Sequence, residues 1–267
     1  MINISELSVK IKQEGYNEET AEAKLCQDII LLLLSKSKFN KSITIKGGVV
    51  MRSISNDVRR ATIDIDLDLI RYPLTVKGIR ELIKELNGIE GIKIRIVGKI
   101  EDLKHQDYNG KRAYIDVEDS FGNYLSNKID IGVHKYLSLE QENYCFDVST
   151  SSDGASLLIN SKEQMFTEKL KSLLKFGAFS ARFKDVYDLY FLITIVDKDT
   201  LLKCFEILIF QDQKMREITI DDIVKRIETT FKNQTYINNL SSSNKNWVGV
   251  KNDIVLKSIL EFLESLR

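Results

Sequence analysis

Acidic residues alternate with apolar ones over residues 63–69, and this pattern is the clearest chemical signal in the chain. Asp64, Asp66 and Asp68 are separated by single apolar residues. A period of two is typical of a β-strand, so the three carboxylates would share one face at spacings of about 7 Å. Like charges so close cost free energy unless cations neutralise them. Because Mg²⁺ prefers carboxylate oxygens together with substrate phosphates, the segment predicts a divalent-metal site.

A glycine pair, Gly47 and Gly48, stands shortly before this segment. Glycine allows the backbone to approach a phosphate closely, so the pair predicts a phosphate-binding turn. The alternative for the acidic segment is an exposed strand edge whose charges prevent aggregation. The glycine pair favours the metal site over that alternative.

A single carboxylate, Asp130, interrupts the apolar run at 128–132. An isolated aspartate in a half-buried strand is often simply turned towards solvent. Beside Asp64 and Asp66 it would instead be a third metal ligand that helps to deprotonate an attacking hydroxyl group.

A basic helical segment follows at 162–184, with six basic and two acidic residues in a chain whose total charge is zero. Lys169 lies at the boundary of the apolar helix face. Its ammonium group would either extend to water or neutralise a triphosphate. Asp185 follows in the next expected helix.

The composition excludes several classes of protein. The 267 residues include 39 basic and 39 acidic ones, so bulk charge gives no sign of nucleic-acid binding. Three scattered cysteines without a Cys/His cluster argue against zinc and against disulfides, and His105 and His134 are expected to be surface or structural residues. Because no signal peptide and no apolar run long enough to span a bilayer is present, we expect a cytoplasmic protein without membrane contact.

The elements that must position these residues follow from periodicity and capping signals. We expect an α/β domain over 1–155 and a helical domain over 156–267. Helices are predicted at 18–37, 49–55, 75–86, 161–175, 182–196, 199–211, 220–231 and 252–265. Strands are predicted at 43–46, 63–69, 92–96, 111–118, 126–133, 144–148 and 156–159. The polar, Ser/Asn-rich residues 233–250 are expected to form a loop.

The order of these motifs resembles that of the AbiEii/AbiGii family of nucleotidyltransferase toxins. The resemblance covers residues 20–195 and rests on the glycine pair, on Arg60-Ala61-Thr62-Ile63-Asp64-Ile65-Asp66, on the isolated Asp130, and on Glu168-Lys169-Leu170 followed by Arg182-Phe183-Lys184-Asp185-Val186-Tyr187-Asp188-Leu189-Tyr190. It implies an α+β fold: a DNA polymerase β-like nucleotidyltransferase with a mixed sheet and helices, followed by a helical C-terminal domain.

The resemblance also implies an activity and partners. It implies an abortive-infection, antiviral toxin that transfers a nucleotide from a nucleoside triphosphate, with Mg²⁺ or Mn²⁺, to the 3′ end of tRNA or another RNA, and so blocks translation. It implies a cognate antitoxin encoded nearby, often a winged-helix repressor. Carried over by motif, Asp64, Asp66 and Asp130 are metal-binding and catalytic residues, and Lys169 and Asp185 are catalytic as well.

Nucleotide contacts are expected from Gly47, Gly48, Lys169 and, as a weaker candidate, Arg60. Asp185 would either orient Lys169 or act as an additional base. Asp66 and Asp68 form a competing metal pair, but Asp64 and Asp66 match the family register. The chain departs from many nucleotidyltransferases at Val49, where a hydroxyl residue is usual, so backbone N–H groups must bind the phosphate there. Two alternatives stay open: transfer of a nucleotidyl or phosphoryl group to a protein hydroxyl, and a non-catalytic binding module.

Overall fold

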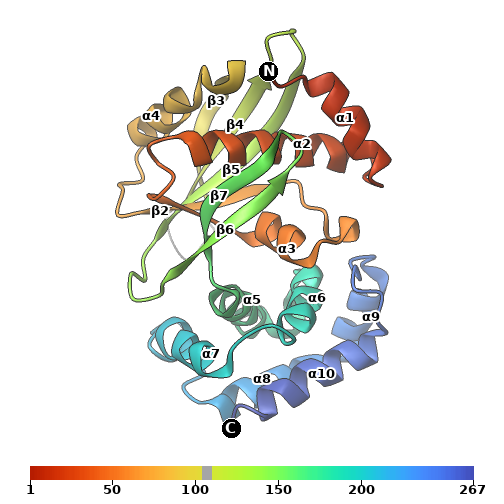
Figure 1. Cartoon of the computed structure of the whole chain (residues 1–267). Coiled ribbons are helices and arrows are strands. Elements are labelled where there is room, and N and C mark those ends of the chain that lie inside the picture. The colour runs from red at the N-terminus through yellow and green to blue at the C-terminus, as the bar shows by residue number, and fades with distance from the viewer. Residues whose placement is uncertain (104–109) are drawn as a thin grey trace. The chain divides into compact units, whose positions relative to one another are not determined.

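The structure is a computed structural model that describes residues 1–103 and 110–267; His105 lies outside the described residues (Figure 1). The chain divides into two compact units, Met1–Asn160 and Ser161–Arg267. Helices of the first unit are α1 (Ile4–Gln13), α2 (Glu18–Lys36), α3 (Gly47–Ser55) and α4 (Val76–Leu86). Its strands are β1 (Ile43–Lys46), β2 (Ile65–Ile70), β3 (Lys93–Leu103), β4 (Gly110–Glu118), β5 (Tyr124–His134), β6 (Gln141–Val148) and β7 (Ser151–Asn160).

Within the described residues, the seven strands form one mixed sheet in the order β3-β4-β5-β2-β1-β7-β6. Strand β2 runs antiparallel to β1 and parallel to β5, so the acidic strand is central. Strands β4 and β5 pair antiparallel as a hairpin. A mixed sheet with helices, followed by a helical C-terminal region, confirms the fold class predicted from the sequence.

Helix α2 supplies much of the core of the first unit. Its leucine-rich segment from Ile29 to Leu34 is almost completely buried, and the helix packs against β5, β6 and β7 (Figure 1). Alternate residues of the central strands, among them Ile45, Leu67 and Ile131, are buried as well. Burial of these apolar side chains fixes the strand register, because a shift by one residue would bring the carboxylates into the core.

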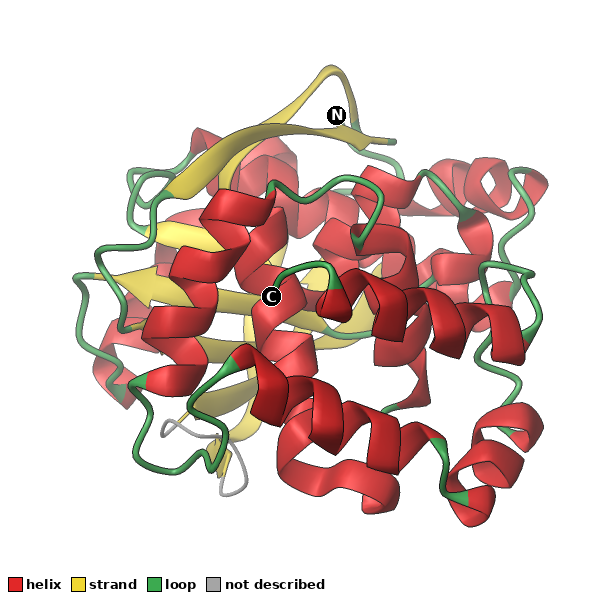
Figure 2. Ribbon diagram, turned by 90° about the horizontal axis from the view of Figure 1, so that it is seen from below, coloured by secondary structure: helices red, strands yellow, loops and turns green. Residues whose placement is uncertain are grey.

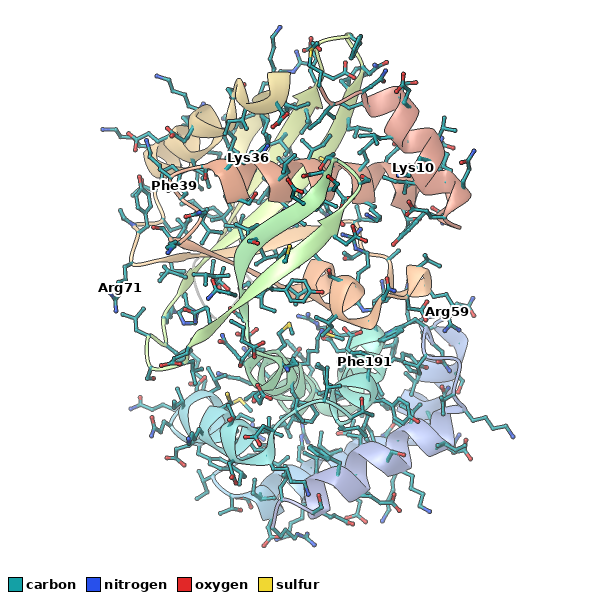
Figure 3. The ribbon with its side chains drawn as sticks, in the orientation of Figure 1. Lys10, Lys36, Phe39, Arg59, Arg71 and Phe191 are labelled. Atoms are coloured by element: carbon teal, nitrogen blue, oxygen red, sulfur yellow. The ribbon has the colours of Figure 1, made fainter. Side chains whose placement is uncertain are left out.

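The second unit, all of whose residues are described, has helices as its only regular elements (Figure 2). These are α5 (Lys162–Phe176), α6 (Phe183–Leu192), α7 (Lys198–Phe205), a π-helical turn (Glu206–Phe210), α8 (Ile220–Phe231), α9 (Gln234–Ser242) and α10 (Asn252–Glu264). Ser161 caps α5 by accepting a hydrogen bond from the Gln164 N–H, as its sequence position predicted. Aromatic rings pack against one another in this unit: the ring of the half-buried Phe191, which Figure 3 labels, has its centroid 5.6 Å from that of Trp247.

Three sequence-based expectations about elements need correction. Strand β2 begins at Ile65, and Ile63 is 41% exposed, so Asp64 lies just before the strand and not within it. The predicted loop at 233–250 contains α9, since Tyr236 and Leu240, four residues apart, form one buried helix face. Helix α1 was not predicted, because only Ile4 and Ile11 of its residues are buried.

Asp119 joins this unpredicted helix to the β4–β5 hairpin. Its carboxylate accepts hydrogen bonds from the backbone N–H groups of Ile4, Phe121 and Asn123, each at 2.9 Å. Burial raises the pKa of Asp119, but the hydrogen bonds from Asn123, Ile4 and Phe121 outweigh burial and hold the pKa below its usual value.

Asp119→Ala is therefore expected to lower the free energy of unfolding by about 1–3 kcal/mol at pH 7, because buried N–H donors lose their acceptor. Since the folded-state pKa is depressed, this contribution is present above the ordinary aspartate pKa of about 3.9 and is lost as the pH falls through the folded-state value. Urea denaturation between pH 7 and pH 3 measures the difference. Asp147→Ala, at an exposed position of β6, is the control, and an equal loss in both variants would contradict the assignment.

Candidate active site

Four charged side chains lie in register across the centre of the sheet. Asp66 of β2 pairs with Lys46 of β1 on one side and with Asp130 of β5 on the other, and Arg112 of β4 pairs with Asp130. Side chains of register partners project from the same face of a sheet. The fold therefore brings Asp66 and Asp130, 64 residues apart in the sequence, onto neighbouring positions of one face.

Basic side chains neutralise this acidic face. Arg112 binds Asp130 through two parallel hydrogen bonds, Nε–Oδ1 and Nη2–Oδ2, both 2.7 Å long. This carboxylate hydrogen bond raises the pKa of the Arg112 guanidinium further above its usual value. Lys128 Nζ lies 3.0 Å from Asp64 Oδ1, and Lys46 Nζ lies 2.7 Å from Asp68 Oδ1.

The two candidate metal pairs differ in burial. Asp68 is 4% exposed and is engaged by Lys46. The Asp64 side chain is 40% exposed and Asp66 is half-buried. Asp68 is therefore the most buried of the three carboxylates.

The glycine pair forms the start of α3 and packs against the acidic face. Gly47 has φ +67°, a backbone conformation that favours glycine, and a Cβ atom there would lie 2.5 Å from Asp66 Oδ2. A Cβ atom at Gly48 would overlap Thr62 Oγ1. The N-cap residue of α3, Lys46, makes no side-chain capping hydrogen bond. The N–H groups at a helix N-terminus are suited to bind an anion, here beside a carboxylate.

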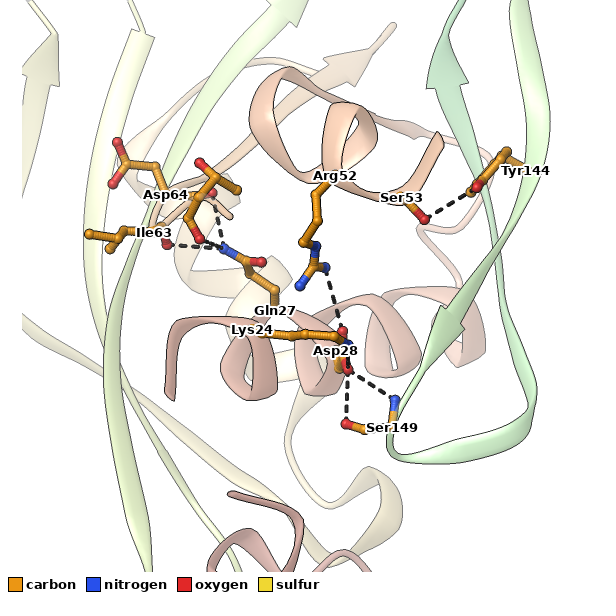
Figure 4. Close-up of polar contacts among 10 residues, drawn as sticks. Lys24, Gln27, Asp28, Arg52, Ser53, Ile63, Asp64, Tyr144 and Ser149 are labelled. Carbon is orange, nitrogen blue, oxygen red and sulfur yellow. Dashed lines mark hydrogen bonds and ion pairs between the residues drawn. The ribbon is translucent and has the colours of Figure 1, made fainter. Parts of the chain in front are cut away.

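Helix α2 fixes the segment that leads into β2 (Figure 4). The buried Gln27 donates its Nε2 protons to the backbone carbonyls of Thr62, Ile63 and Asp64, at 2.9, 3.2 and 3.4 Å. The neighbouring Asp28 is also buried and accepts hydrogen bonds from the Ser149 N–H at 2.9 Å and hydroxyl at 2.8 Å.

Asp28 also connects α2 to α3. It lies 2.6 Å from Lys24 Nζ and 3.6 Å from Arg52 Nη2 of α3 (Figure 4). Through Gln27 and Asp28, α2 holds both the glycine-bearing helix α3 and the backbone of Asp64.

Arg60, the weaker candidate for a nucleotide contact, is buried, with 3% exposure, in the 3₁₀ turn Val58–Arg60.

A second charged cluster lies inside the helical unit. Lys169 of α5 is 8% exposed, and its Nζ lies 2.8 Å from Asp185 Oδ1 and 2.7 Å from Asp188 Oδ2 of α6. Trp247 donates its indole N–H to Asp188 Oδ1 at 3.0 Å, and Arg182 Nε lies 2.7 Å from Asp185 Oδ2. The ammonium group thus does not extend to water, which was one of the two sequence-based alternatives for Lys169.

Four residues of these clusters were not singled out from the sequence: Gln27, Lys46, Arg112 and Asp188. Asp188 stands three residues after Asp185, and this helical spacing already predicts a shared face. The other three carry no local signal, because their contacts depend on strand register and on the packing of α2.

Comparison with known proteins decides the family. The nucleotidyl transferase AbiEii toxin family, of type IV toxin–antitoxin systems, matches residues 29–253. This chain belongs to the AbiEii family. The match confirms the resemblance seen in the motifs, and it implies a nucleoside triphosphate substrate and a cognate antitoxin.

Other comparisons add little to the AbiEii assignment. Among curated proteins, none matches the sequence. One similar solved structure is a crystal structure of an antigenic nucleotidyltransferase-like protein from Paracoccidioides brasiliensis, which is 17% identical with a TM-score of 0.47, over 84% of this chain and 93% of that chain. Within the described ranges, no helix has the length and apolar character needed to cross a membrane.

The carboxylates fit a divalent cation by donor chemistry but are engaged by basic residues. Among the described residues, no three His, Cys, Asp or Glu side chains stand close enough together to hold a metal ion. Hard carboxylate oxygens of Asp64, Asp66 and Asp130 nevertheless suit Mg²⁺ or Mn²⁺, and the lack of a side chain at Gly47 lets the start of α3 lie directly against Asp66. Lys128 and Arg112 would have to release part of their contacts to such a cation.

Replacing Gln27 by Glu is expected to reduce nucleotide transfer by about 10-fold or more, because the isosteric carboxylate cannot donate to the three carbonyls and repels them. Initial rates and thermal unfolding of both proteins measure the effect. Glu22→Gln, at an exposed position of the same helix, is the matched control. Unchanged rates in Gln27→Glu would show that the backbone before Asp64 needs no support from α2.

Lys169→Ala is expected to cost about 3–5 kcal/mol of stability, because the ammonium group between the buried carboxylates of Asp185 and Asp188 is lost, and Asp188 then lacks this cation. Adding Asp188→Asn to Lys169→Ala removes one unpaired charge and should restore part of the loss. Chemical denaturation of the single and double variants tests this. A Lys169→Ala protein as stable as Lys175→Ala, which alters an exposed position of the same helix, would contradict the buried cluster.

Proposed function

We propose that this protein is a cytoplasmic, Mg²⁺- or Mn²⁺-dependent toxin that transfers a nucleotide from a nucleoside triphosphate to the 3′ end of an RNA, most specifically a tRNA. One observation carries the proposal: Gly47 and Gly48 begin a helix against Asp66, which is in register with Asp130. A phosphate-binding helix terminus and two carboxylates thus adjoin on one sheet face. Modification of the tRNA acceptor end would block translation, and a cognate antitoxin, in our proposal a winged-helix repressor, would restrain the activity.

Asp64, Asp66 and Asp130 are the residues that would hold the divalent cations. When bound, the cations would neutralise the triphosphate and activate the 3′ oxygen. The first N–H groups of α3 bind the phosphate oxygens, which replaces the hydroxyl contact that is lost at Val49. Asp130 accepts the proton of the RNA 3′-hydroxyl as the new bond to the α-phosphorus forms and the bond to pyrophosphate breaks.

The helical unit contributes the ammonium group of Lys169, which Asp185 already holds in place. The short Asp185–Lys169 contact supports the proposal that Asp185 orients Lys169, rather than acting as an additional base. Contact of Lys169 with the triphosphate stays a prediction, as does contact of Arg60, because both side chains are buried.

A labelling experiment tests this function. The purified protein is incubated with total RNA and each of the four α-³²P-labelled nucleoside triphosphates, with Mg²⁺ or with EDTA. We expect label in RNA of tRNA size, only with the divalent cation. Label in the protein band would favour transfer to a protein hydroxyl, and no label with any nucleotide would favour the non-catalytic alternative.

Asp66→Asn is expected to reduce transfer by on the order of 10²-fold or more, since a carboxylate that would hold the divalent cation is lost. Asp68→Asn is its matched control on the same strand and face: the amide still accepts a hydrogen bond from Lys46, so transfer should persist. Rates of labelled-nucleotide incorporation measure both. If Asp68→Asn is inactive and Asp64→Asn is active, the metal pair is Asp66 and Asp68.

A further inference from the structure

The sequence from Lys169 to Lys184, which includes the turn between α5 and α6, contains basic residues but no aspartate or glutamate. From Lys169 to Lys184 the chain contains five basic residues, no acidic residue, and three phenylalanines at 176, 179 and 183. No role in nucleotide transfer has been given to the middle of this segment.

Two of these rings face solvent. Phe179 is 95% exposed and Phe176 is 48% exposed, whereas Phe166 and Phe205 of the same unit are fully buried. A phenylalanine ring that is fully exposed contributes no hydrophobic free energy of burial to folding, so its position on the surface needs an explanation other than packing.

The turn that carries Phe179 is held firmly. Residues Gly177–Phe179 form a 3₁₀ turn, closed by the hydrogen bond from the Ser180 N–H to the Gly177 carbonyl at 3.0 Å. Gly177 has φ +53°, and a Cβ atom there would lie 2.6 Å from Arg226 Nη2 of α8. Arg226 in turn donates Nε–H to the Leu174 carbonyl at 3.2 Å, which ties α8 to the end of α5.

Cations flank the exposed rings. Lys175 Nζ lies 5.9 Å from the centroid of the Phe176 ring. The Arg182 side chain is 64% exposed and reaches Asp185 of the charged cluster. The turn therefore presents aromatic faces and positive charge together, next in sequence to the residues that the proposed function uses.

We propose that this turn is a stacking platform for a single-stranded end of the RNA substrate, with Phe179 as the ring on which a base stacks. The inference rests on the proposed function, whose acceptor it identifies as unpaired RNA. Aromatic rings beside lysine and arginine are the means by which proteins hold single strands, because every base has a π-face and every phosphate attracts a cation. Lys169, Lys171 and Arg182 of this segment already pair with carboxylates of the helical unit, and the exposed Lys175 beside the Phe176 ring offers positive charge to a phosphate backbone.

The test measures binding of a fluorescein-labelled, single-stranded RNA oligonucleotide of about 12 nucleotides, within the site sizes known for such surfaces. We expect Phe179→Ala to raise the dissociation constant for the RNA by about 5- to 100-fold, as for the loss of one base–aromatic stack. The melting temperature should not change. Phe179→Tyr should bind like the wild type. Phe121→Ala, which removes a 61% exposed ring from the β4–β5 hairpin, is the matched control and should bind normally.

Salt dependence separates stacking from charge. The logarithm of the association constant falls linearly with the logarithm of the salt concentration. Lys175→Gln should make this slope less steep by about one, whereas Phe179→Ala should leave it unchanged. An equal dissociation constant in Phe179→Ala and wild type would overturn the platform. Loss of antitoxin binding in Phe179→Ala with unchanged RNA binding would also overturn it, in favour of a protein-docking surface.

Failure of the platform and failure of the proposed function give different results. Transfer to RNA by the wild type, with an unchanged KM for RNA in Phe179→Ala, rejects the platform alone. Phe179-dependent RNA binding without transfer of any nucleotide rejects the proposed function and supports the platform.

Discussion

Neutralisation of like charges on one face of β2 is the constraint on which the rest of the first unit depends. Asp64, just before β2, and Asp68 within it each have a lysine partner, and Asp130 beside Asp66 is held by two nitrogens of the Arg112 guanidinium group, Nε and Nη2. These contacts exist only in one strand register. The register is fixed by the opposite, apolar face, where a shift of one residue would exchange buried side chains for carboxylates.

The same constraint explains how several carboxylates can lie close together. Their pairing with arginine and lysine offsets the mutual repulsion of like charges. In the proposed function, a divalent cation would replace part of this pairing when the triphosphate binds. The helical unit repeats the arrangement with the signs reversed, because Lys169 is enclosed by Asp185 and Asp188.

Local patterns in the sequence predicted most of the fold. Alternation, caps and turn residues predicted β1, α4, the β4–β5 hairpin and α5 to within a few residues, because each depends on neighbours in the chain. Helix α9 was missed because its polar composition hides one buried face, and α1 because the tertiary contact of Asp119 fixes its start.

The long-range contacts of the candidate site could not be predicted from the sequence. The carboxylates stand out by their spacing, but the bidentate Arg112 follows only from strand order, and Gln27 only from the packing of α2. The sequence placed Lys169 at the boundary of the apolar face of its helix, because nothing local to α5 reveals that α6 supplies two carboxylates to it.

A crystal structure of the protein with Mg²⁺ and a non-hydrolysable nucleoside triphosphate tests the central claim most directly. The account predicts Mg²⁺ at about 2.1 Å from oxygens of Asp64 and Asp66, phosphate oxygens at the first N–H groups of α3, and at least one hydrogen bond between Arg112 and Asp130 released. Triphosphate bound elsewhere, with Lys128 and Arg112 still fully engaged and no cation at Asp66, would contradict it.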